Sequence, residues 1–212
     1  MQLSDVEVRI LGCLIEKEAT TPDNYPLSLN ALTNACNQLS NREPVMSLAE
    51  DKVKWAVNNL RQQSLVRAIQ PSDARVMKFQ HLLTEKLDLD QRGCAVLCVL
   101  TLRGPQTLGE IKTRTNRLAE FTSLADVEAA MRDLIARELA VELARRPGQK
   151  ELRYAHLLSG PPSEVQAEAP VEIPAMEPRQ DRIAELEASV DELRRDLAAL
   201  RERFDEFTRQ FS

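Results

Sequence analysis

The stretch SLAEDKVKWAVNNLRQQSLVRAIQ, residues 47–70, decides the fold because its apolar period changes part-way along it. Its first apolar side chains recur at the spacing of a helix, at Val53, Ala56, Val57 and Leu60. Ser47 with Glu50 three residues later has the spacing of a capping box, which predicts a helix from Ser47 to about Gln63. Residues 65–69 and 75–80 then alternate as strands around the turn Pro71-Ser72-Asp73. The stretch therefore predicts a helix that leads directly into a β-hairpin.

Two more helices are expected before this one. Ser4 or Asp5 caps a helix that runs to about Glu18, and Ser28 caps a short helix that runs to about Gln38. Pro22 and Pro26 place a loop between these two helices. Three helices followed by a two-stranded wing are the arrangement of a winged helix, which is a helix-turn-helix with an attached hairpin.

The same pattern occurs twice in the chain. KFQHLL at 78–83 matches RYAHLL at 153–158, and the apolar spacing of 53–65 matches that of 127–139. The additional residues of the first copy fall in loops near 20–26 and 41–47. The sequence therefore predicts a mainly α protein with small β-hairpins, built from two tandem winged-helix domains at 1–88 and 89–159.

The rest of the chain is of a different kind. Residues 160–180 are proline-rich and predict an extended linker, and residues 181–212 carry an unbroken heptad pattern. The heptad a and d positions are Ile183, Leu186, Val190, Leu193, Leu197, Leu200, Phe204 and Phe207. This pattern favours a coiled-coil homodimer, parallel or antiparallel, over an amphipathic helix that folds back on the body.

Several short motifs carry a resemblance to a known family. They are TPDNYPLSLNAL at 21–32, ACNQ at 35–38, NREPV at 41–45 and LRGPQT at 102–107. The chain resembles, over about residues 1–160, the YceH-like family of bacterial proteins. The resemblance implies tandem winged helices and brings no catalytic residues with it. Leu39 departs from the basic residue expected there, which removes a phosphate contact.

Composition disfavours catalysis by metals or phosphate-binding loops. The chain has six Gly and two His, which leaves little for a glycine-rich phosphate cradle or a histidine metal site. His81 and His156 occupy equivalent positions, so we expect an architectural hydrogen bond from each. We expect a protein that is not an enzyme and that binds neither a cofactor nor a metal.

Cysteine spacing and hydropathy bear on the compartment. The four cysteines show no short-spaced framework, so we expect reduced, buried thiols in a cytoplasmic protein. No apolar run reaches the roughly 20 residues that a membrane span requires, so no membrane association is expected.

Charge is unevenly distributed along the chain. The formal net charge of −5 divides into +1 for residues 1–159 and −6 for residues 160–212, so the predicted winged helices are neutral. On the third helix of the first copy, Asn58 and Gln62 point outward and suit adenine edges, while Lys54 and Arg61 beside them suit phosphates. Glu50 and Asp51 in its first turn oppose a phosphate there.

The second copy carries a modest cluster of basic residues. Lys112, Arg114 and Arg117 lie on its second helix, and Arg145, Arg146, Lys150 and Arg153 surround its wing. The third helix of this copy presents Ala125, Ala129, Arg132 and Ala136, a poor set for reading bases. This distribution favours sequence-independent contacts with the DNA backbone.

Two functions follow from these patterns. The first is DNA binding through wings and third helices, as in a transcription regulator. The alternative is a protein–protein adaptor in which the winged helices are docking platforms. Trp55, predicted on an outward face, would then contact a partner protein or the second domain.

Overall fold

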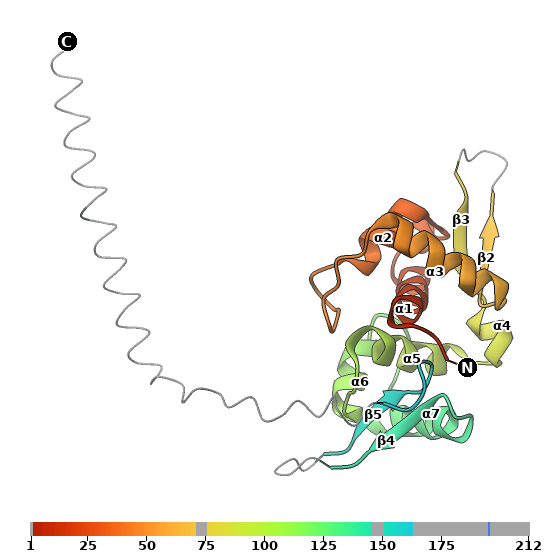
Figure 1. Ribbon diagram of the computed structural model, residues 1–212. Helices are drawn as coiled ribbons and strands as arrows, with labels where there is room; N and C mark the ends of the chain where they lie inside the picture. Colours follow the sequence, from red (N-terminus) through yellow and green to blue (C-terminus); the bar gives the residue numbers. More distant parts are fainter. Residues whose placement is uncertain (1, 71–75, 146–150, 163–194, 196–212) are drawn as a thin grey trace. The chain divides into compact units, whose positions relative to one another are not determined.

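Figure 1 shows the computed structural model, which describes residues 2–70, 76–145, 151–162 and 195. Its contacts divide the chain into one compact unit, Met1–Ser163, and a second unit, Glu164–Ser212. The first unit is mainly helical and contains two small antiparallel sheets. In the second unit the structure describes Arg195, which is helical and exposed.

The first copy begins with a well-capped helix. Helix α1 (Asp5–Thr20) has Ser4 as its N-cap, in a capping box with Glu7. A short 3-10 turn, η1 (Pro22–Asn24), leads to strand β1 (Leu27–Ser28), and the Ser28 hydroxyl caps helix α2 (Leu29–Cys36). The copy continues with helix α3 (Glu50–Gln62) and strands β2 (Val66–Ile69) and β3 (Lys78–His81).

The three strands form one sheet in the order β1-β3-β2, and all its pairs are antiparallel. Val66 lies opposite His81 in the hairpin, and Leu27 of β1 lies opposite Phe79 on the other side of β3. Helix α4 (Leu83–Leu87) then connects the sheet to the second copy.

The second copy repeats this order of elements. Helices α5 (Gln91–Arg103), α6 (Leu108–Thr115) and α7 (Leu124–Ala136) precede strands β4 (Ala140–Leu143) and β5 (Arg153–His156). The hairpin register is equivalent, because Ala140 lies opposite His156. A single bridge between Gln106 and Tyr154 stands where β1 pairs with β3 in the first copy.

Helices α1 and α5 pack against each other and form the shared core of the unit. The Cys98 thiol of α5 donates to the Gly12 carbonyl of α1 at 3.4 Å. A Cβ added at Gly12 would lie 2.6 Å from Thr101 Oγ1 and 2.8 Å from Leu102 Cδ2. A side chain at residue 12 would therefore force Thr101 and Leu102 to shift, because the two helices approach closely there.

The described elements differ from the expected ones mainly at their ends. The expected capping box at Ser47 is wrong, because α3 begins at Glu50 after Ala49, which makes no side-chain cap. The Asn37 side chain bonds both the N–H and the carbonyl of Leu48, which holds this segment outside the helix. β3 begins at Lys78, later than expected. Both hairpin turns, the linker beyond residue 162 and the predicted heptad helix, apart from Arg195, lie outside the described residues.

Candidate nucleic-acid interface

Helix α3 is held by one buried apolar stripe. Val53, Ala56, Val57 and Leu60 are each at most 1% exposed, as their helical spacing predicts. This burial turns the other side of the helix outward, and Lys54, Asn58, Arg61 and Gln62 are all exposed. The structure therefore brings the four predicted nucleic-acid residues of the first copy onto one surface.

A hollow of about 540 Å³ lies beside α3, between the start of α2 and β3. Glu50, Lys54, Asn58 and Arg61 line it from α3, and Val76, Met77 and Phe79 line it from β3 and the residues before it. Val76 is 55% exposed and Met77 45%, so the wall opposite the charged side chains is apolar. Asn58 and Arg61 also line a second, more open hollow that continues past Gln62 to β2.

Two contacts modify the charge and the orientation of these side chains. Arg61 Nη1 donates to Asn58 Oδ1 at 3.2 Å, which orients the Asn58 amide. Arg67, at the edge of the second hollow, lies 3.7 Å from Glu85, and both side chains are more than half exposed. An ion pair as exposed as this one contributes little to stability, so Arg67 can exchange its partner for a phosphate at small cost.

Trp55 is 64% exposed on α3, as the sequence predicts. The alternative in which it packs on the second copy is therefore wrong for this unit. Other exposed large apolar side chains of the described residues include Leu39 and Val45 in the loop between α2 and α3.

The third helix of the second copy presents a different surface. Ala125, Glu128, Ala129, Arg132 and Ala136 are exposed on α7. Arg132 lies 3.6 Å from Glu128, and Arg137 lies 2.9 Å from Asp133, so these charges are paired along the helix itself. The structure confirms that the outward residues of α7 are mostly short.

The predicted basic cluster of the second copy is partly neutralised. Glu110 lies 3.6 Å from Arg114 and 3.6 Å from Arg153, and its carboxylate also caps α6 through the N–H of Thr107. Lys112 is half-buried, whereas Arg117 and Arg145 are exposed. Arg146, Lys150 and the eight predicted heptad residues lie outside the described residues.

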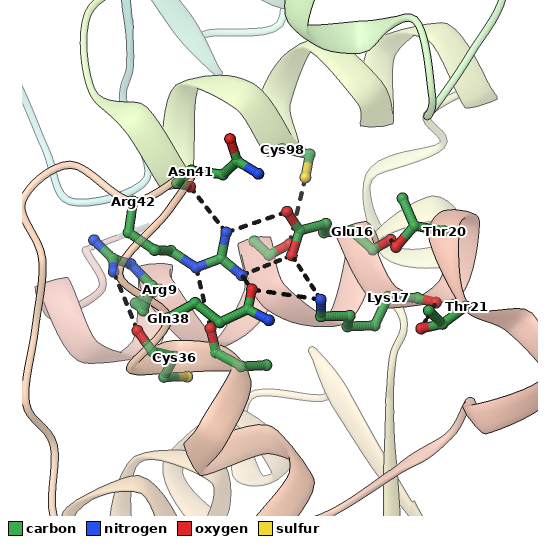
Figure 2. A network of polar contacts seen from close by, with 12 residues as sticks. Arg9, Glu16, Lys17, Thr20, Thr21, Cys36, Gln38, Asn41, Arg42 and Cys98 are labelled. Atoms are coloured by element: carbon green, nitrogen blue, oxygen red, sulfur yellow. Dashed lines mark hydrogen bonds and ion pairs between the residues drawn. The ribbon is translucent and has the colours of Figure 1, made fainter.

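Sequence reasoning missed a buried polar network that fixes the loop between α2 and α3 (Figure 2). Arg42 is completely buried and makes five hydrogen bonds, two of them to the carboxylate of Glu16 at 3.1 and 2.6 Å. Its others go to Gln38 and to the carbonyls of Ala35 and Asn41. The arginine thus ties the loop to α1 and to the end of α2.

Burial and pairing act in opposite directions on this pair. Burial alone would raise the pKa of Glu16, but hydrogen bonding and Coulombic attraction to Arg42 outweigh it and leave the pKa lowered. Burial likewise would lower the pKa of Arg42, and the Glu16 carboxylate leaves that pKa raised. Both groups are therefore charged at neutral pH.

Arg9 of α1 is a second buried arginine that donates hydrogen bonds to the end of α2 and to the loop between α2 and α3. It is 1% exposed and donates to the carbonyls of Cys36 and Pro44 at 3.3 and 2.6 Å, while its Nε has no partner in the structure. The sequence does contain one signal of this network. Arg9 interrupts the apolar run of α1, and a charged side chain buried there requires hydrogen-bond partners.

The two histidines differ. His81 accepts from the N–H of Leu83, and its Nε2 lies 2.8 Å from Glu18, so it joins β3 to α1. The equivalent His156 has a buried Nδ1 without a hydrogen-bond partner, so the architectural hydrogen bond expected there is absent from that atom. Burial lowers the pKa of His156 to about 4.

The cysteines are free and buried, as expected for small apolar core residues. Burial raises the pKa of Cys94 to about 12 and also raises that of Cys98 well above the ordinary value of a thiol. Within the described residues, no group of three or more His, Cys, Asp and Glu side chains could hold a metal ion. Nor does any helix among them have the length and apolarity to cross a membrane.

Comparison with known proteins places the chain among similar sequences. Residues 3–149 match the family DUF480, described as a protein of unknown function. A UPF0502 protein of Pelobacter propionicus is 50% identical, over 100% of this chain and 99% of its own length. UPF0502 proteins of Herminiimonas arsenicoxydans and Vibrio parahaemolyticus are each 47% identical, over 96% and 95% of this chain and 88% and 95% of their own lengths.

Proposed function

This chain belongs to the DUF480 family, whose relatives here are called UPF0502 proteins, and we propose that it is a DNA-binding protein with two tandem winged helices. The order of helix, strand, two helices and hairpin supports the winged-helix assignment, as does the second copy with its equivalent register. The proposal is of a binding protein and not of an enzyme.

One observation carries this proposal. Lys54, Asn58 and Arg61 stand together along the exposed side of α3, at the mouth of the hollow beside the hairpin. In a DNA-bound helix-turn-helix the outward side of this helix enters the major groove. Two cationic side chains then reach phosphates, while the amide between them faces base edges.

A salt-dependent anisotropy titration of the full chain on fluorescent mixed-sequence duplexes tests the proposal. We expect binding tighter than about 10 µM at low salt, with an affinity that falls steeply as salt rises. The Lys54→Ala/Arg61→Ala double variant should reduce the slope of log affinity against log salt by about 2, since each phosphate contact contributes about 0.9.

The matched control is Lys86→Ala/Arg132→Ala, which removes two exposed cationic residues from α4 and α7. It should leave the slope unchanged. Absence of binding at low salt contradicts the proposal. Equal losses in the two double variants contradict the assignment of phosphate contacts to Lys54 and Arg61.

The exposure of Trp55 favours a second candidate function. A large aromatic side chain that is 64% exposed is typical of a protein contact, so the first copy would act as an adaptor. Affinity capture from lysate with the full chain and with Trp55→Ala compares the bound proteins. Identical sets of partners contradict this alternative.

We further propose that the chain forms a homodimer through the eight heptad positions between residues 183 and 207, all of which lie outside the described residues. The heptad spacing supports this, and sedimentation equilibrium of the full chain measures it. Leu193→Lys/Leu197→Lys places two charges at a and d positions and should give a monomer. A wild-type chain that is already monomeric contradicts the proposal.

A further inference from the structure

The third helices of the two copies can be compared position by position. Helix α3 spans Glu50–Gln62 and α7 spans Leu124–Ala136, so each residue of α3 has an equivalent 74 positions later. The buried stripes agree, because Val127, Met131 and Leu134 are buried where Val53, Val57 and Leu60 are. The outward residues of the two helices are therefore also equivalent.

These outward residues differ in chemistry. Asn58 and Gln62 correspond to Arg132 and Ala136, and Lys54 corresponds to Glu128. Asparagine and glutamine can form two hydrogen bonds with an adenine edge, whereas alanine makes none. On α7 the Glu128 carboxylate stands at the position of Lys54, lies 3.6 Å from Arg132 and would repel a phosphate.

The positions of the two helices matter as well. α3 packs on α1 and α7 packs on α5, and the packed pair α1–α5 lies between them (Figure 1). The third helices thus lie on opposite sides of that pair. A straight duplex seated on α3 therefore does not reach α7.

We infer that each chain reads the sequence of one duplex through α3 alone and that α7 takes no part in DNA recognition. This inference rests on the DNA-binding function proposed above and assigns sequence reading to Asn58 and Gln62. The Asn58 amide is oriented by Arg61 Nη1, which occupies one lone pair of Oδ1. The other lone pair and the Nδ2 group remain for the two bonds to adenine.

The helix geometry fixes the size of the recognised site. From Lys54 to Gln62 the helix rises about 12 Å at 1.5 Å per residue, which corresponds to roughly four base pairs at about 3.4 Å each. Asn58 and Gln62 are one turn apart, about 6 Å, which spans about two base pairs. The site should contain two adenines at about that separation.

Selection of the full chain on duplexes with a randomised centre tests this inference. The wild-type chain should enrich a core of about four base pairs with two adenines. Asn58→Ala and Gln62→Ala should each relax one of these positions, with about a tenfold loss of discrimination. The matched control Arg132→Ala, at the position equivalent to Asn58, should leave the motif and the affinity unchanged.

The outcomes separate the two claims. Salt-dependent binding without any enriched motif overturns sequence reading by α3 and leaves the DNA-binding function in place. A changed motif in Arg132→Ala shows that α7 takes part and also overturns the inference. Failure to bind any duplex in the anisotropy titration instead contradicts the proposed function itself.

Discussion

Replacing Arg42 by methionine should strongly destabilise the protein, because Arg42 is the centre of a buried network. The substitution keeps most of the volume and removes five hydrogen bonds, two of them to the Glu16 carboxylate. Removing one partner of a buried ion pair costs about 3–5 kcal/mol. Glu16 keeps Lys17 at 3.5 Å, so we expect the lower end, about 3 kcal/mol.

Replacing the other partner of the ion pair, in Glu16→Gln, should lower the free energy of unfolding by at least as much. It leaves the Arg42 guanidinium, which is 0% exposed, with no carboxylate beside it, whereas the Glu16 side chain that Arg42→Met leaves unpaired with arginine is 14% exposed in the structure. The destabilisation caused by Glu16→Gln should also depend on pH. The lowered pKa of Glu16 stabilises the fold above the unfolded-state pKa, and this contribution is lost as pH falls through the folded-state value. The difference in the free energy of unfolding between wild type and Glu16→Gln should therefore become smaller at acidic pH.

Urea unfolding followed by circular dichroism measures these changes. With a slope of about 2 kcal/mol per molar urea, a loss of 3 kcal/mol lowers the midpoint by about 1.5 M. Arg132→Met is the matched control, because it makes the same substitution in an exposed pair and should cost less than about 0.5 kcal/mol. An Arg42→Met variant within about 1 kcal/mol of wild type would refute the assigned role of the network.

Three further predictions concern single contacts. Gly12→Ala should destabilise the unit by about 1–3 kcal/mol in urea unfolding, because its Cβ would collide with Thr101 and Leu102. Gly109→Ala, whose nearest neighbour is 4.0 Å away, is its control and should be neutral or slightly stabilising. His156 is neutral in the fold, with a pKa of about 4 against an ordinary histidine value of 6.5, so the unfolded chain binds its proton first as pH falls. Stability should therefore decrease by up to about 3 kcal/mol between pH 6.5 and 4, and His156→Gln should remove this decrease in unfolding curves across that range. Tyr25→Phe leaves the buried N–H of His81 without the 2.9 Å bond to the Tyr25 hydroxyl, and calorimetry should show a loss of about 1–3 kcal/mol; an unchanged transition would contradict this.

The helices could be predicted from the sequence because their evidence is local. The cap at Ser4 and the apolar stripe of α3 each lie within a few turns of one helix. β1 could not be found this way, because its two residues are a strand only through pairing with β3. The start of α3 was misplaced for the same reason, since Asn37 bonds Leu48 from eleven residues away.

The candidate site was predicted in part. The outward side of α3 follows from periodicity, so Lys54, Asn58, Arg61 and Gln62 could all be named. The apolar wall of the hollow could not be predicted, because Val76 and Met77 lie beside α3 only when the hairpin packs next to that helix. The pairing of Glu110 with Arg153 also joins residues distant in sequence. Together with the Glu110–Arg114 pair within α6, it weakens the basic cluster that composition alone indicated.

The close crossing of α1 and α5 has a consequence for any attempt to dissect the protein. Each of these helices supplies the apolar surface that covers the other, so neither copy possesses a complete interior by itself. A fragment that stops at residue 88 would leave one side of α1 bare, with Gly12 at its centre. Such a fragment should aggregate, or should pair with a second fragment through α1 in the place that α5 vacates.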